Sequence, residues 1–225
     1  MTFFSRVMIN PMDRHVLRVG SSLQRMHAVL AKATDAQASN QRTLWRLDRG
    51  LGSAWAKLYI VSAEKPKQDI LQAELGIRPA DMACTEYEPF LSKLECGQEW
   101  GFRITANPTH SIMGSDGVSR GARKPLVKRD DQEQWLCRQL RKSGCHVTIN
   151  RLEQPELRIQ DVQQTSFGRR TSTVTLTRVT YEGLLSIDDA DSLRRTMLEG
   201  IGPAKAYGCG LLTLAPLAPN MVKQH

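Results

Sequence analysis

Histidine has an ordinary pKa of about 6.5, which suits it to accept and donate protons near neutral pH. The chain of 225 residues contains five histidines. His225 stands at the end of the chain and His146 lies in a predicted strand, so neither is a favoured catalytic group. His15 and His110 lie in predicted loops and His27 lies in a predicted helix. These three are the candidates for general acid–base chemistry.

A glycine-rich segment near the C-terminus is a candidate for phosphate binding. Residues 200–210 read GIGPAKAYGCG and contain Gly200, Gly202, Gly208 and Gly210 together with Lys205. Glycines let backbone N–H groups approach a phosphate without Cβ obstruction, and a lysine adds positive charge. The segment is no Walker loop, because no GK[ST] begins a helix, and no dinucleotide-binding turn, because a strand follows it. The structural alternative is a turn that only joins a helix to a strand.

The positive charge of the chain is concentrated in its middle. The chain has 31 Lys and Arg against 23 Asp and Glu, and residues 101–180 hold 14 of the basic and seven of the acidic side chains. Five basic side chains there lie in or next to a segment rich in Gly and Ser: Arg120, Arg123, Lys124, Lys128 and Arg129. This segment is expected to be either a solvated loop or a loop that contacts phosphates. Arg169 and Arg170 stand at the expected tip of a β-hairpin, which could enter a groove of folded RNA.

Composition excludes several classes of protein. With 40% apolar and 24% charged residues, the chain has the balance of a globular protein and not of a fibre or a disordered tail. No run approaches the roughly 20 apolar residues of a membrane helix. Arg6 interrupts the apolar stretch that a signal peptide would need, so we expect a cytoplasmic protein. The five cysteines include no CxxC pair, so we expect reduced, buried thiols, no disulfide framework and no zinc site. We also expect no other metal and no cofactor.

Hydrophobic periodicity predicts an α+β protein with two lobes. Strand-like and helix-like segments follow one another twice in the order βαββαβ, over residues 3–87 and again over residues 100–214. The first copy includes a helix that follows Ser21 and Ser22, with apolar residues at helical spacing up to Ala33. We therefore predict two tandem ferredoxin-like lobes, residues 1–92 and 93–225, each an antiparallel sheet with helices on one face.

Several segments resemble one protein family. The tail GIGPAKAYGCGLLTLAPL resembles the C-terminal glycine-rich loop of the CasE family, the endoribonucleases that process CRISPR RNA in type I-E systems. Further segments resemble this family in the same order, namely SRVMINP, QRMHAVLAKA, TLWRLD, FRITANP with a basic loop ending in KPLVK, QEQWLCRQL and YEGLLSIDD. The resemblance implies two ferredoxin-like lobes of the repeat-associated RNA-binding superfamily. It also implies metal-independent cleavage of precursor CRISPR RNA beside the repeat stem-loop, retention of the crRNA, and membership of the Cascade complex.

The resemblance also selects residues for catalysis. The segment MHAVLAKA matches the family's catalytic helix, which makes His27 the expected general acid or base, with a pKa lowered by nearby cations. Lys32 would stabilise charge on the scissile phosphate. Gln24 stands where some members carry a tyrosine; it can orient a phosphate but cannot transfer a proton. Other members place their histidine where this chain has Gly20. The proton donor therefore stays open between three candidates: Tyr59, Tyr207 and a solvent molecule.

The resemblance further points to a basic hairpin that reads an A-form RNA stem by its shape and phosphates. Arg169 and Arg170 are the hairpin candidates, and the basic segment that begins at Arg120 supplies additional phosphate contacts. A function of a different class is an assembly subunit that binds the RNA stem-loop but cleaves weakly or not at all. Gln24 and Gly20, where the family's proton-transferring residues are missing, favour this alternative.

Overall fold

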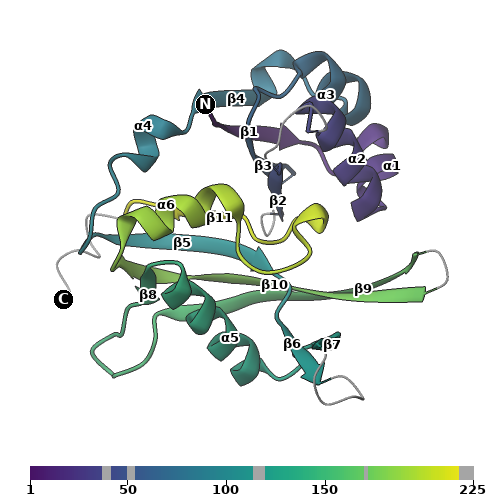
Figure 1. Ribbon diagram of the computed structural model, residues 1–225. Coiled ribbons are helices and arrows are strands. Elements are labelled where there is room, and N and C mark those ends of the chain that lie inside the picture. The colour runs from purple at the N-terminus through teal and green to yellow at the C-terminus, as the bar shows by residue number, and fades with distance from the viewer. Residues whose placement is uncertain (37–41, 50–53, 114–119, 170–171, 218–225) are drawn as a thin grey trace. The chain divides into compact units, whose positions relative to one another are not determined.

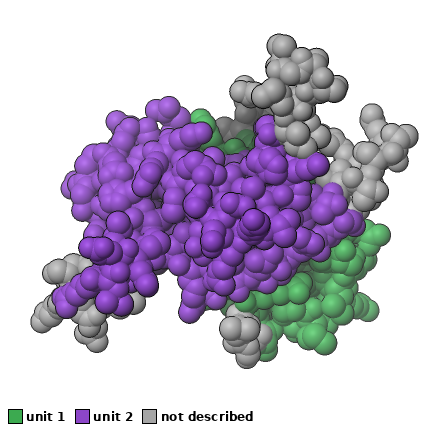
Figure 2. All heavy atoms as spheres, turned by 90° about the horizontal axis from the view of Figure 1, so that it is seen from below, with its two compact units in different colours: residues 1–94, 198–200, 205–211 green, residues 95–197, 201–204, 212–225 purple. Residues whose placement is uncertain are grey.

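The structure is a computed structural model that describes residues 1–36, 42–49, 54–113, 120–169 and 172–217 (Figure 1). The chain forms two compact units, which Figure 2 distinguishes by colour. Unit 1 comprises residues 1–94, 198–200 and 205–211, and unit 2 comprises residues 95–197, 201–204 and those from 212 onward. The expected lobes differ in two respects: unit 1 runs to residue 94 and not to 92, and residues 198–200 and 205–211, expected in the second lobe, pack in unit 1.

Unit 1 contains one antiparallel sheet of four strands. These are β1 (Phe3–Ile9), β2 (Leu44–Arg49), β3 (Ala56–Ser62) and β4 (Met82–Glu86), paired in the order β2-β3-β1-β4. Its helices are α1 (Arg14–Gly20), α2 (Leu23–Ala33), α3 (Gln68–Leu75), the short η1 (Pro79–Asp81) and α4 (Glu88–Leu91). Val7 and Leu58 of the sheet share one buried core with Leu30 and Leu71 of the helices. One face of the sheet is thus covered by helices.

The helix α2 forms where the sequence predicts it. Ser22 caps its start, because its side chain accepts a hydrogen bond from the backbone N–H of Arg25. Buried residues recur along one face of the helix from Met26 to Ala33. The shorter α1 before it was not expected; its signal is Asp13, whose side chain accepts from the backbone N–H of His15.

Unit 2 repeats the same sheet order with one extra strand. β5 (Glu99–Ala106), β8 (Cys145–Val147), β10 (Ser172–Ile187) and β11 (Leu212–Ala215) pair in the order β11-β5-β10-β8, and β9 (Leu157–Arg169) pairs with β10. The helices are α5 (Arg129–Lys142) and α6 (Ala190–Glu199). In unit 1, β1 lies between β3 and β4, and in unit 2, β5 lies between β10 and β11. The first strand of each βαββαβ motif thus lies between its third and fourth strands. The prediction of two ferredoxin-like lobes is confirmed.

The basic segment of unit 2 differs from the expected loop. It forms a two-stranded hairpin of β6 (Thr109–Met113) and β7 (Arg120–Pro125), in which His110 pairs with Lys124 and Ser111 with Arg123. The alternation of small and basic residues in β7 lacks the apolar side chains that mark a strand in the sequence. The helix α5 starts one residue before the expected cap Asp130, with Lys128 at its N-cap position.

The sequence predicted reduced, buried cysteines and no membrane-spanning helix. All five cysteines are free thiols, as expected, but only Cys145 and Cys209 are buried, whereas Cys96 is exposed. Among the described helices, none combines the length and the hydropathy that crossing a lipid bilayer requires.

Candidate functional site

The exposed side of α2 carries two of the predicted catalytic residues. His27 lies at the border of the buried stripe and is half-buried, next to the fully buried Met26. Gln24, one helical turn earlier, is exposed. Residues three apart in a helix lie on the same face. The helix therefore presents an imidazole and an amide together at the surface of unit 1.

The environment of His27 favours its neutral form. Burial lowers the pKa of His27 below its ordinary value, and the positive charge of Arg42 lowers it further. A lowered pKa keeps more of the imidazole neutral at pH 7, and only the neutral form can accept a proton. The direction agrees with the expectation. The cation that lowers the pKa of His27, however, is Arg42, which precedes β2, and not a basic residue of α2 itself.

Lys32 does not lie beside His27. Five residues separate the two along α2, which places their side chains about 140° apart around the helix axis. Lys32 is exposed. The predicted contact between Lys32 and the scissile phosphate therefore stays a prediction, and Lys32 is no close neighbour of the imidazole.

The glycine-rich segment wraps around the edge strand β2 of unit 1. The short helix η2 (Lys205–Tyr207) packs against α2. Beyond it, Gly208 packs on the ring of Trp45, and the carbonyl of Leu211 accepts a hydrogen bond of 2.9 Å from Nη1 of Arg46. Among the described strands, none pairs with the outer side of β2, so residues 205–211 can pass along that edge. This path brings Lys205 to α2.

The glycines of this segment serve close packing. A Cβ atom on Gly208 would lie 2.8 Å from Cζ3 of Trp45, and one on Gly200 would lie 2.9 Å from a methyl carbon of Leu44. In unit 2, a Cβ atom on Gly202 would lie 2.9 Å from the ring of Trp135. Gly210 is buried as well. Protein side chains thus fill the space at three glycines where the sequence suggested a phosphate, and phosphate binding by the segment's N–H groups stays a prediction.

We expect Gly208→Ala to destabilise the protein more than a matched substitution at Gly97. Both glycines have positive φ, +74° and +82°, but a Cβ on Gly97 meets no atom within 4 Å. The backbone conformation alone costs an alanine about 1–2 kcal/mol, and overlap with Trp45 adds about 1–3 kcal/mol. Urea denaturation measures both variants. Equal losses in the free energy of unfolding would contradict the role assigned to the Trp45 contact.

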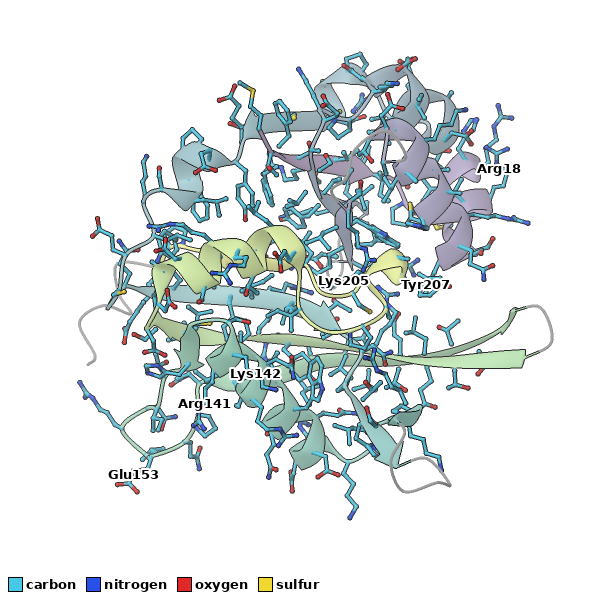
Figure 3. The ribbon with its side chains drawn as sticks, in the orientation of Figure 1. Arg18, Arg141, Lys142, Glu153, Lys205 and Tyr207 are labelled. Atoms are coloured by element: carbon cyan, nitrogen blue, oxygen red, sulfur yellow. The ribbon has the colours of Figure 1, made fainter. Side chains whose placement is uncertain are left out.

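Lys205 and His27 share a charged neighbour. Lys205 is half-buried, and burial lowers its pKa; Arg42 lowers it further, while Glu199 opposes this shift. Arg42 thus acts on both Lys205 and His27. Figure 3 shows Lys205 and Tyr207 on η2, next to α2. Among the described residues, no group of three or more His, Cys, Asp and Glu side chains is arranged to hold a metal ion.

Comparison with known proteins identifies the family. A family model described as "CRISPR associated protein" matches residues 2–216. The chain belongs to this family. Cascade subunit CasE of Escherichia coli K12 is 35% identical over 136 residues, which cover 56% of this chain and 62% of that protein, a little under two thirds of its length. The CRISPR-associated endoribonuclease Cse3 of Thermus thermophilus is 26% identical over 222 residues, covering 95% of this chain and all of that protein.

A solved structure supports the same assignment. Thermus thermophilus Cse3, bound to an RNA representing a pre-cleavage complex, matches with a TM-score of 0.76 and 27% sequence identity. The match covers 96% of this chain and 99% of that one. The resemblance to the CasE family in the sequence is thereby confirmed.

The two tyrosines considered as proton donors in this CRISPR associated protein occupy different places. Tyr59 lies in β3 between Leu58 and Ile60, which both face the helix-covered core. Alternation along the strand turns Tyr59 to the opposite face, where the guanidinium of Arg46 lies 5.3 Å from its ring centre. Tyr59 is therefore not a neighbour of α2. Tyr207, in contrast, belongs to η2, which packs against α2.

The predicted RNA-binding cations of this CRISPR associated protein lie in unit 2. Arg123 and Lys124 of β7 and Lys128 at the start of α5 are exposed. Arg120 begins β7 and Arg169 ends β9. Arg170 lies outside the described residues. These positions suit contacts with a polyanion, and their role in RNA binding stays a prediction.

Proposed function

We propose that this CRISPR associated protein is an endoribonuclease that binds the stem-loop of a CRISPR repeat RNA and cleaves the precursor beside the stem. The names of its relatives support the reaction: one is an endoribonuclease and one a subunit of Cascade. The observation that carries the proposal is the half-buried His27 on an exposed helix flank, whose pKa is lowered by burial and by the charge of Arg42. The protein then retains the crRNA as a Cascade subunit in the cytoplasm.

The groups around His27 suit attack by a ribose 2′-hydroxyl. His27 accepts the hydroxyl proton while the 2′-oxygen bonds to the adjacent phosphorus, and the bond from phosphorus to the 5′-oxygen breaks. The products are a 2′,3′-cyclic phosphate and a 5′-hydroxyl. Arg42 and Lys205 supply positive charge for the phosphorane, and Gln24 orients a phosphate oxygen. The proposed reaction uses protein groups alone and needs no metal ion.

The proposed function is tested by incubating the protein with end-labelled CRISPR repeat RNA in EDTA. We expect one cut beside the stem and fragments that end in a cyclic phosphate and a 5′-hydroxyl. RNA that stays intact although it binds tightly would contradict the proposal and would favour the second candidate, an RNA stem-loop-binding assembly subunit. Gln24, which cannot transfer a proton, is the feature that favours this second candidate.

The exposed cations of unit 2 lead to a prediction about how RNA affinity depends on salt concentration. Lys124→Ala removes one charge from β7, and if that charge neutralises one phosphate, the plot of log affinity against log salt concentration becomes flatter by about 0.7–0.9. Binding titrations at several salt concentrations measure the slope. Arg78→Ala is the matched control, because Arg78 already pairs with Asp81 at 2.9 Å; its slope is expected to equal that of the unaltered protein. A slope unchanged in Lys124→Ala would remove Lys124 from the RNA interface.

A further inference from the structure

The site of unit 1 lacks an assigned proton donor for the leaving group. A 5′-oxygen departs as a strongly basic alkoxide unless an acid protonates it. Gln24 carries no transferable proton, and Tyr59 faces the other side of the sheet. Lys32 points away from His27 around the helix. Among the described residues, the candidates for a protein donor are therefore the titratable groups of η2, which packs against α2.

We propose that Lys205 is the general acid that protonates the 5′-oxygen of the leaving strand, an assignment that rests on the proposed endoribonuclease function. Its element η2 packs directly against α2, which carries His27. The place of η2 is fixed on its C-terminal side by the packing of Gly208 on Trp45 and by the hydrogen bond from Arg46 to Leu211. A general acid needs such a fixed position beside the reacting atoms.

The surroundings of Lys205 suit an acid. Two charged groups act on Lys205, namely Arg42 before β2 and Glu199 at the end of α6. The titratable groups on the elements next to it are His27 on α2, against which η2 packs, and Tyr207 on η2 itself. Burial, followed by the charge of Arg42, lowers the pKa of Lys205 from its ordinary value near 10.5, against the opposing effect of Glu199. A lower pKa makes the ammonium of Lys205 a stronger acid. Its charge also attracts the phosphorane.

Tyr207 is less suited to this role. In a 3₁₀ helix each turn takes three residues, so side chains two positions apart point about 120° away from each other. Lys205 and Tyr207 therefore leave η2 in different directions. Lys205 also carries a positive charge before it gives up the proton, whereas a tyrosine is neutral and adds none.

The two proton transfers balance. His27 takes the proton of the 2′-hydroxyl as the 2′-oxygen bonds to phosphorus. The electron pair of the breaking bond goes to the 5′-oxygen, which takes a proton from the ammonium of Lys205. The enzyme is left with a protonated His27 and a neutral Lys205. Exchange of both protons with solvent, or between the two side chains, restores the starting state.

The test combines variants of Lys205 with a substrate that needs no acid. In one RNA the scissile 5′-oxygen is replaced by sulfur, which departs as a thiolate without protonation. We expect Lys205→Arg, which keeps the positive charge, to cleave the ordinary RNA about 10²–10⁴-fold more slowly than the unaltered protein and the sulfur-containing RNA within a few-fold of it. Lys205→Ala also removes the charge, so we expect it to slow both RNAs, and the ordinary RNA more than the sulfur-containing one. Lys65→Ala, which removes an exposed lysine elsewhere in unit 1, is the charge-matched control and is expected to cleave both RNAs normally.

The outcomes separate this inference from the proposed function. If Lys205 only binds the phosphate, Lys205→Ala slows both RNAs equally and Lys205→Arg cleaves both well; either result overturns the assignment. His27→Ala is expected to slow both RNAs, because the base is needed with either leaving group. If the unaltered protein cleaves neither RNA, the endoribonuclease function itself fails. With ordinary RNA, the fall in rate at high pH is also expected to disappear in Lys205→Arg, whose guanidinium does not titrate.

Discussion

His27→Ala is expected to slow single-turnover cleavage of repeat RNA by about 10²–10⁴-fold, the usual contribution of a general acid or base. The loss comes from the 2′-hydroxyl, which keeps its proton when the imidazole is absent. RNA affinity is expected to change little, because the half-buried neutral side chain offers little charge to a phosphate. Measurements at saturating protein separate the rate of the chemical step from binding.

The pH profile adds a second readout for His27. Its pKa is lowered from the ordinary 6.5, so the cleavage rate is expected to rise with pH only at pH values below that ordinary value. In His27→Ala this rise disappears. His15→Ala is the matched control, since His15 lies on α1 and pairs with Asp13 at 3.0 Å. A rate in His27→Ala that equals the rate in His15→Ala would refute the catalytic role of His27.

Local signals account for what could be predicted of the fold. The cap at Ser22 and the apolar spacing up to Ala33 specify α2, and they work because both depend only on neighbouring residues. The order βαββαβ then restricts the pairing of strands to few topologies. The hairpin of β6 and β7 could not be recognised in this way, because its strands lack apolar alternation.

The site was only partly predictable, because its members come together from distant parts of the chain. His27 has a family segment around it, whereas Arg42 is a single arginine before a strand and carries no signal of its own. Its importance follows from the fold, which lets one guanidinium act on both His27 and Lys205. Likewise, the glycines of residues 200–210 are visible in the sequence, but their packing against Leu44 and Trp45 is a long-range contact.

Arg46 of β2 links the sheet of unit 1 to the segment that carries Lys205. Only 1% of its surface is exposed. Its Nε and Nη2 donate to the two carboxylate oxygens of Asp48 at 2.8 and 3.0 Å, and its Nη1 donates to the carbonyl of Leu211 at 2.9 Å. The position of η2 against α2 therefore depends on a side chain that touches neither His27 nor Lys205 by any of these bonds.

We expect Arg46→Ala to lower the free energy of unfolding by about 3–5 kcal/mol, because it leaves the largely buried carboxylate of Asp48 without this partner. Urea denaturation followed by circular dichroism measures the loss. Arg49→Ala, at the exposed end of the same strand, is the control and is expected to change stability by less than about 0.5 kcal/mol. If the two variants were equally stable, the bonds of Arg46 would not be what holds the segment.

The same variant connects stability to catalysis. Without Arg46, Leu211 loses the hydrogen bond that fixes residues 205–211 to β2, so Lys205 is no longer held against α2. At low temperature, where Arg46→Ala is still folded, cleavage of ordinary RNA is therefore expected to fall, whereas RNA with a 5′-sulfur leaving group, which needs no acid, is expected to be cleaved at a rate closer to normal. Equal losses on both RNAs would mean that Arg46 supports the position of His27 and not that of Lys205.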